Sequence, residues 1–455
     1  MHMADLNTTL ARLNELTDWE RRPRVGMRVG LESMVDLMLR LGNPHRSFRS
    51  VHVGGTKGKG SVCALVEAAL FQAGHRVGRY SSPHLQHVTE RVSINQSTIS
   101  ESDLALHLTV ALSAFEDARR RNTAAAAATW FDLLTAAAFL SFEAAAIDWA
   151  VIEVGLGGRR DSTNVIDAEV AVITNVELEH TEVLGSTRSA IAREKVGILK
   201  KGAVLITPIP TDDAAGFVLH EQAGLLGCPV LRTGPCAGST IDGRNAELAG
   251  LVLDHLGEIG VQSVLGNVTP RPVGAWLLDQ TVRSRARLPG RMERLNVESI
   301  CETGQPPQSI PVILDGAHVP FNLDAVMRDL RSGPEFDISC VAVVALANDK
   351  DARGMLRVMS QHASHIVFTE LPGTSRGHDV ALLETIAGSL GVTCETLSDP
   401  LKAFERAIDV ASKRGLWVIV TGSLHLVGSI RNSSAVASAM ELDRKPGALR
   451  VPDNE

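Results

Sequence analysis

The chain has 455 residues, a formal net charge of −7 and 44% hydrophobic residues. This length exceeds the size at which one hydrophobic core usually keeps growing, so we expect two domains. The negative charge gives no general attraction to nucleic acid or to an anionic membrane, and we expect neither as a partner. With a single tyrosine in the chain, surfaces that stack bases are also not expected.

The six cysteines are scattered without a CxxC pair, which argues against a zinc site or a disulfide framework and is typical of a reducing compartment. Residues 1–5 lack the basic and apolar regions of a secretory signal, and no uninterrupted apolar run has membrane-spanning length. We therefore expect a cytoplasmic, monomeric enzyme that acts on small molecules.

Helical patterns occupy most of residues 5–46, with a loop around 21–23. A short apolar run at 51–53, a glycine-rich turn and a helical pattern at 62–70 follow. Such a turn binds anions through its backbone N–H groups and the helix dipole. Lys59 would supply a point charge for the outer phosphates and Ser61 a hydroxyl for Mg²⁺. Because Gly60 separates these two residues, the spacing departs from the standard P-loop, and a glycine-rich turn with an incidental lysine is the alternative.

Further strand-like runs at 76–80, 149–154, 170–174 and 203–206 alternate with helical patterns at about 101–120 and 130–145. This alternation predicts a parallel sheet covered by helices on both faces. Ligands of such sheets bind beyond the carboxyl ends of the strands. The loop at 81–84 and the polar segments that end these strands are therefore candidate parts of a site.

A change in composition near 288–291 precedes a second series of strand-like runs, at 311–314, 340–346, 365–368 and 416–421. No GxGxxG follows any of them, so a dinucleotide is not indicated. We expect an α/β fold with three parts. These are a P-loop ATP-binding domain with a parallel central sheet at 1–290, a smaller Rossmann-like α/β domain at 291–443, and a disordered tail at 444–455.

Several polar residues follow the predicted strands. Glu153 could coordinate Mg²⁺ or end its strand in a salt bridge. The segment 177–182 places three carboxylates around His180, which predicts either a metal site or a solvated acidic loop. Lys195 would ordinarily face solvent on a helix; near a metal, its amine could instead react with CO₂ to form a carbamate ligand. Asp315 and His318 repeat the pattern in the second domain, where a helix N-cap is the alternative for Asp315.

Ten segments in this order resemble the folylpolyglutamate synthase/dihydrofolate synthase family of Mur-type ATP-dependent amide ligases. The resemblance covers about Gly30 to Arg431 and rests on the following segments: 30–32, 53–61, 81–85, 90–92, 153–159, 179–181, 193–195, 289–291, 315–318 and 422–424. It implies that ATP phosphorylates a carboxylate of a pteroate or folate, and that the amino group of glutamate then attacks the acyl phosphate. ADP and phosphate are released.

The resemblance also implies roles for individual residues. Catalytic roles fall to Lys59, Lys195, His180 and His318. ATP contacts fall to Gly55, Thr56, Lys57, Gly58, Lys59, Gly60, Ser61, Asn245, Arg291 and Asp315. A first Mg²⁺ would be held by Ser61, Ser82 and Glu153, and a second by His180 and carbamylated Lys195, with a monovalent cation as an optional addition. The pterin side would involve Gly30, Leu31, Glu32, Ser33, Thr129, Trp130, Phe131, Asp132, Arg160, Asp161 and Ser162. Glutamate would be received by His318 and Ser423.

Four residues depart from the family pattern. Lys57 stands where asparagine is usual, Glu179 replaces an aspartate, Asp132 stands where glutamate is common, and Val319 replaces an asparagine. Two alternative functions therefore stay open in addition to the folate ligase. One is a Mur-type ligase with a diverged acceptor or amino acid, and the other is a nucleotide-binding regulatory protein without catalysis. Retention of Lys59, Ser61, Glu153, His180 and Lys195 together argues against the last.

Overall fold

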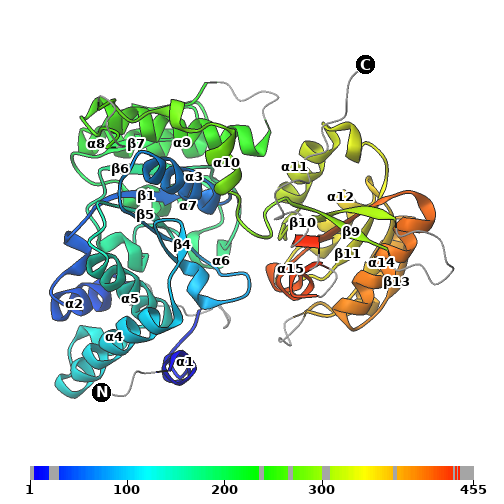
Figure 1. Cartoon of the computed structure of the whole chain (residues 1–455), viewed down its shortest axis with the longest axis horizontal. Helices are drawn as coiled ribbons and strands as arrows, with labels where there is room; N and C mark the ends of the chain where they lie inside the picture. The colour runs from blue at the N-terminus through cyan, green and yellow to red at the C-terminus, as the bar shows by residue number, and fades with distance from the viewer. Residues whose placement is uncertain are drawn as a thin grey trace. The chain divides into compact units, whose positions relative to one another are not determined.

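The computed structural model describes residues 5–19, 30–234, 240–264, 270–299, 308–371, 377–433, 436–437 and 439–440. They form two compact units, Met1–Arg287 and Leu288–Glu455 (Figure 1). The division follows Arg287, beside the domain boundary that the sequence predicts after residue 290. The loop expected at 21–23 and the tail expected at 444–455 lie outside the described residues.

Unit 1 contains a sheet of eight strands in the order β4-β3-β2-β5-β1-β6-β7-β8. The strands are β1 (Arg49–Gly54), β2 (Val77–Tyr80), β3 (Val92–Ile94), β4 (Ser97–Thr98), β5 (Trp149–Glu153), β6 (Val170–Ile173), β7 (Val204–Ile206) and β8 (Val230–Leu231). The predicted parallel sheet is confirmed for β2, β5, β1, β6 and β7. Sequence reasoning missed the short strands β3, β4 and β8, and β3 and β4 pair antiparallel at one edge.

The helices of unit 1 cover this sheet, as Figure 1 shows. They are α1 (Leu6–Asn14), α2 (Glu32–Arg40), α3 (Lys59–Gln72), α4 (Glu101–Arg121), α5 (Trp130–Ala144), α6 (Thr181–Leu184), α7 (Arg188–Lys195), α8 (Ala214–Leu226), α9 (Ile241–Glu258) and α10 (Gln280–Arg285). Helix α3 is buried continuously from Val62 to Leu70 and packs against α9. The N-terminus of α3 is therefore held rigidly above the carboxyl end of β1.

A histidine lies inside the central strand of this sheet. His52 on β1 is fully buried, and its Nε2 lies 2.9 Å from the hydroxyl of Thr163. Its Nδ1 is buried without a hydrogen-bond partner. Burial, with a smaller contribution from Lys200, lowers the pKa of His52 to about 3. The side chain is therefore neutral throughout the physiological range.

This histidine makes stability depend on pH. Between pH 6.5 and about 3 the unfolded chain protonates His52 and the folded chain does not. The free energy of unfolding therefore decreases as the pH is lowered through that window. When the pH is lowered from 7 to 5, the free energy of unfolding should decrease by about 2 kcal/mol less in His52→Leu than in the wild type. Urea unfolding at both pH values measures this difference. The exposed His87, changed to leucine, serves as the control. An unchanged pH slope in His52→Leu would contradict the assignment.

Unit 2 contains a sheet of six strands in the order β13-β12-β11-β14-β10-β9. The strands are β9 (Glu293–Glu298), β10 (Ser309–Leu314), β11 (Cys340–Val344), β12 (Ala363–Phe368), β13 (Thr393–Thr396) and β14 (Trp417–Thr421). The helices are α11 (Pro320–Arg331), α12 (Ala352–Met359), α13 (Val380–Ser389), α14 (Pro400–Arg414) and α15 (Leu424–Arg431). All neighbours are parallel except β9 and β10. The four predicted strands are confirmed, and β9 and β13 were missed.

Helix α11 begins without a side-chain cap. Val319 occupies the N-cap position with an extended backbone, and its side chain cannot accept a hydrogen bond from the first turn. Val319→Asn should therefore raise the free energy of unfolding by about 1 kcal/mol relative to Val319→Ala, which removes the same branched side chain without adding a cap. Urea unfolding of both variants measures the difference. Equal stability of the two would show that the cap does not form.

Candidate functional site: a phosphate-binding loop with a buried lysine

The turn between β1 and α3 has the geometry of an anion-binding loop. Gly58 caps α3 in the left-handed region, with φ of 85°, and Lys59 is the first residue of the helix. Gly55 has φ of 140°, and a Cβ atom there would lie 1.9 Å from the Thr174 hydroxyl. Only glycine allows this approach, so Gly55 brings the backbone of the loop against the end of β6.

Two residues after β6 hold the loop in place. Asn175 Oδ1 accepts hydrogen bonds from the backbone N–H groups of Thr56 and Lys57 at 3.2 and 2.9 Å, and its Nδ2 donates to Lys57 O at 3.0 Å. The Thr174 hydroxyl donates to the same carbonyl at 2.6 Å. Sequence reasoning missed both residues. The available signal was their position directly after a strand at the carboxyl edge of the sheet.

Asn245 reaches the loop from α9. A Cβ atom added at Gly58 would lie 2.7 Å from Asn245 Oδ1, so the amide rests directly against the N-cap of α3. Asn245 is 9% exposed. The structure thus brings this residue, which the resemblance alone had singled out, together with the glycine-rich loop about 190 residues earlier in the chain.

Glu153 lies at the carboxyl end of β5, opposite Val53 of β1. It is 5% exposed; its Oε1 lies 3.9 Å from the ammonium of Lys59, and its Oε2 accepts a hydrogen bond from the Ser82 N–H at 3.2 Å. The structure therefore joins three predicted site residues, and Ser61 stands in the same first turn of α3 as Lys59. The described part of the chain has no group of three or more His, Cys, Asp or Glu placed to hold a metal ion. A cation here would need the hydroxyl groups as well as Glu153.

Hydrogen bonds fix the chain on both sides of Ser82. Glu90 accepts hydrogen bonds from the N–H groups of Leu85, Gln86 and His87 at 2.7–2.9 Å. On the other side, the buried Glu67 of α3 accepts from Arg79 Nε at 2.6 Å, and Arg79 also bonds the Ser81 hydroxyl. The resembling segments at 81–85 and 90–92 thus form one folded loop beside Glu153.

Lys195 is the last residue of α7 and is 5% exposed, so the ordinary expectation of a solvent-facing lysine is wrong. Its Nζ donates a hydrogen bond to the carbonyl of Gly55 at 2.7 Å. Burial lowers the pKa of Lys195 to about 7, helped by the charges of Lys59 and Lys57 and opposed by Glu179. A substantial fraction of the amine is therefore neutral near physiological pH.

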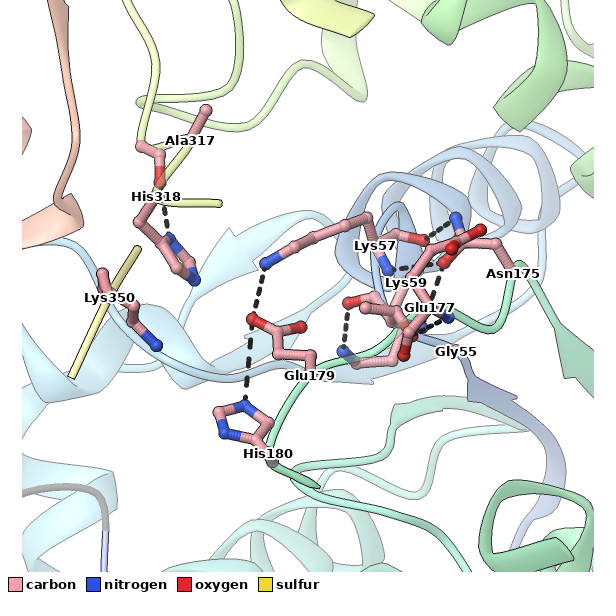
Figure 2. Close-up of polar contacts among 12 residues, drawn as sticks. Gly55, Lys57, Lys59, Asn175, Glu177, Glu179, His180, Ala317, His318 and Lys350 are labelled. Carbon is pink, nitrogen blue, oxygen red and sulfur yellow. Dashed lines mark hydrogen bonds and ion pairs between the residues drawn. The ribbon is translucent and has the colours of Figure 1, made fainter. Parts of the chain in front are cut away.

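The segment around His180 combines buried and exposed carboxylates. Glu179 is 10% exposed in its side chain and accepts a hydrogen bond from Lys57 Nζ at 2.9 Å, as Figure 2 shows. His180 lies beside it with φ of 54°, and its Nε2 is 3.9 Å from Glu179 Oε1. Glu182 has a side chain 46% exposed. The expectation of a solvated acidic loop is thus wrong for Glu179 and holds for Glu182.

In unit 1, helix α2, which begins within the first segment predicted for the pterin side, contacts both α5 and the turn at Ser162–Val165, and these two contact each other. Thr129 and Asp132 form a capping box at the start of α5, and the Ser162 hydroxyl donates to Asp132 Oδ1 at 2.6 Å. Asp161 is buried, which raises its pKa, and it accepts a hydrogen bond from Leu156 N–H at 2.8 Å. In this arrangement Asp132 fixes the start of α5.

Within unit 2, Asp315 joins two loops. Its carboxylate accepts hydrogen bonds from the N–H groups of Met292 and Ala317 at 2.9 and 2.8 Å. Asp315 is therefore not the helix N-cap that the sequence allowed, because α11 begins at Pro320. Arg291 lies beside the same turn, since a Cβ atom at Gly316 would be 3.5 Å from Arg291 Nη1.

His318 and Ser423 lie on loops that are hydrogen-bonded to each other. His318 Nδ1 is 2.8 Å from Gly316 O, Gly422 N–H donates to Ala317 O at 2.8 Å, and Ser423 caps α15. The sequence analysis did not consider Lys350, whose Nζ lies 3.3 Å from Asp349. It belongs to the polar segment 348–351, which follows β11 at the carboxyl edge of the sheet.

Two family models match this chain. Residues 53–249 match the Mur ligase middle domain, and residues 290–424 match the Mur ligase glutamate ligase domain. The first match includes the phosphate-binding loop, Glu153 and Lys195, and the second includes Arg291, Asp315 and Ser423. The fold and the site therefore define a Mur-type ATP-dependent ligase.

The similarity extends over nearly the whole chain. A dihydrofolate synthase/folylpolyglutamate synthase of Bacillus subtilis is 30% identical over 90% of this chain and 96% of its own length. A folylpolyglutamate synthase structure from Mycobacterium tuberculosis, complexed with ADP and AMPPCP, is 27% identical, covers 94% of this chain and 98% of its own and has a TM-score of 0.75. A bifunctional folylpolyglutamate synthase/dihydrofolate synthase from Yersinia pestis, complexed with AMPPNP and a Mn ion, is 29% identical, with coverages of 94% and 97% and a TM-score of 0.74. This chain belongs to the dihydrofolate synthase/folylpolyglutamate synthase family.

No helix in the described ranges is both long and apolar enough to cross a membrane.

Proposed function

We propose that this chain, a glutamate ligase of the folate type, joins the amino group of L-glutamate to a carboxylate of dihydropteroate or of a folate through an acyl phosphate. The observation that carries the proposal is the group formed by Lys59, Glu153 and Ser82 beside the N-terminus of α3. It combines a cradle of N–H groups, one cation and one buried carboxylate, which are the parts that phosphoryl transfer requires.

The residues present fit a divalent cation. Ser61, Ser82 and Glu153 would hold a first Mg²⁺ next to the phosphate-binding loop, and their hydroxyl and carboxylate oxygens are ligands that Mg²⁺ prefers. His180 and carbamylated Lys195 would hold a second. The cations would neutralise charge on the β- and γ-phosphates.

The chain's own residues would then act in order. Lys59 stabilises the negative charge that develops as the acceptor carboxylate attacks the γ-phosphorus and ADP leaves. Asn245, Arg291 and Asp315 would contact the nucleotide. His318 and Ser423 would orient glutamate so that its amine attacks the acyl carbon, and phosphate departs.

Lys195 would take part as a carbamate. A neutral lysine amine forms a bond from Nζ to the carbon of CO₂ and releases one proton, which leaves an anionic carboxylate on the side chain. The pKa near 7 supplies the neutral amine, and the nearby cations Lys57 and Lys59 favour the product's negative charge.

The test is ADP release by the purified protein with Mg-ATP, L-glutamate and either dihydropteroate or tetrahydrofolate. We expect release that needs both acceptor and glutamate, and activity with both acceptors would define a bifunctional enzyme. Release of AMP would exclude the acyl-phosphate route. Activity only with other amino acids or acceptors would favour the diverged ligase, and an absence of turnover would favour the regulatory protein. We further propose that the enzyme acts as a monomer in the cytoplasm.

A further inference from the structure

Lys57 and Glu179, the two departures from the family pattern in unit 1 that flank the nucleotide site, contact each other. Lys57 Nζ lies 2.9 Å from Glu179 Oε1, and Figure 2 shows the two side chains extended toward one another. The side chains are 20% and 10% exposed, so salt screens this pair less than an ion pair on the surface. The proposed mechanism gives Lys57 only the role of favouring a negative charge on Lys195, and it gives Glu179 no role.

The pair adds a second contact between the segment 177–180 and the phosphate-binding loop. At one end, Glu177 N–H donates to the Thr56 hydroxyl at 3.0 Å, which attaches the start of the segment 177–180 to the phosphate-binding loop. At the other end, Glu179 directly precedes His180, so its contact with Lys57 attaches the part that presents the imidazole. The segment is therefore fixed to the loop at both ends.

The lengths and charges of the two side chains are complementary. An extra lysine on the loop adds a positive charge where a divalent cation would have to bind, which opposes cation binding. Glutamate is one methylene longer than aspartate and in this structure reaches the Lys57 ammonium. Its carboxylate offsets that charge.

We propose that Lys57 and Glu179 act as one positioning unit that holds His180 beside the phosphate-binding loop and balances the charge of the cation site. The inference rests on the proposed function, because it concerns the same nucleotide and metal site. Binding of divalent cation and nucleotide then depends on the pair as a whole, and loss of one member is compensated by loss of the other.

A double-mutant cycle tests this with Lys57→Gln, Glu179→Gln and the double variant. The readout is the Kd of Mn²⁺ in the presence of AMPPNP, measured by electron paramagnetic resonance without folate or glutamate. Glu179→Gln should weaken Mn²⁺ binding by about tenfold, because it removes a carboxylate charge that offsets Lys57 beside the cation. The double variant should return to within about twofold of the wild type. The exposed pair Lys413 and Asp409, changed to glutamine and asparagine, is the matched control.

The outcomes distinguish a failure of the Lys57–Glu179 coupling from a failure of the proposed function. If the double variant binds Mn²⁺ as weakly as Glu179→Gln alone while the wild type binds Mn²⁺ and AMPPNP, the pairing of Lys57 with Glu179 is wrong and the proposed function stands. If the wild type binds neither, the proposed nucleotide site itself is wrong. Should Glu179→Gln fail to fold, Glu179→Asp, which withdraws the carboxylate from Lys57 while keeping its charge, replaces it. Weaker Mn²⁺ binding restored by adding Lys57→Gln would then support the pair, and binding equal to the wild type would overturn it.

Discussion

Lys59→Ala is expected to lower kcat/KM for ATP by about 1,000-fold, because no other side chain offers a cation in the first turn of α3. The ammonium lies 3.9 Å from Glu153 and 3.4 Å from Thr56 O, so it is already held beside the phosphate cradle before substrate arrives. The measurement is ADP release under saturating glutamate and acceptor.

Two further variants make the Lys59 result specific. Lys201→Ala removes an exposed lysine outside the site and should leave kcat/KM unchanged. Lys59→Arg keeps the charge but spreads it over a planar group, and it should recover only part of the activity. Full activity in Lys59→Ala would show that the loop binds phosphate without this cation.

Lys195→Ala should lower activity by at least about 100-fold and be partly rescued by short carboxylates such as acetate, if a carbamate is the functional group. The buried side chain leaves a space beside the Gly55 carbonyl that a small anion can enter. Lys195→Met, which fills most of that space, is the control and should not be rescued. Equal behaviour of the two variants toward acetate would contradict an anionic role.

The carbamate also predicts a pH dependence. Only the neutral amine reacts with CO₂, so at fixed dissolved CO₂ the modified fraction should rise as the pH increases through about 7, the pKa of Lys195. A lysine with its ordinary pKa would need a much more alkaline solution. The carbonyl carbon of the carbamate, observed by NMR with ¹³C-labelled CO₂, reports this directly. Its absence at pH 8 in the wild type would remove the carbamate from the mechanism.

Local sequence patterns were enough for the main elements of both sheets. The runs at 149–152 and 170–173 are continuously apolar because strands buried on both faces contact helices on each side, and this signal does not depend on the rest of the chain. The strands that were missed, such as β4 and β8, have two residues each, too few to show any periodicity. They exist because an adjacent strand offers free hydrogen-bonding groups.

The resemblance to the ligase family added residues that no local pattern supports. Asn245 is an example, since an asparagine inside a helix carries no signal for nucleotide binding, although the structure places it against Gly58. For Asp132, in contrast, the structure shows a structural role, whereas the resemblance implies a substrate contact. Its carboxylate is occupied by the start of α5 and by Ser162, and a contact with substrate stays a prediction.

By itself the sequence determined the glycine-rich loop, the cation at Lys59 and the carboxylate at the end of β5, because strand ends and turns are set by neighbouring residues. Only the tertiary structure decided the state of Lys195 and the pairing of Lys57 with Glu179. Both depend on burial and on distances between residues more than 100 positions apart. The energy of a charged group is governed by its surroundings in space, and those surroundings exist only once the sheet has brought the strand ends together.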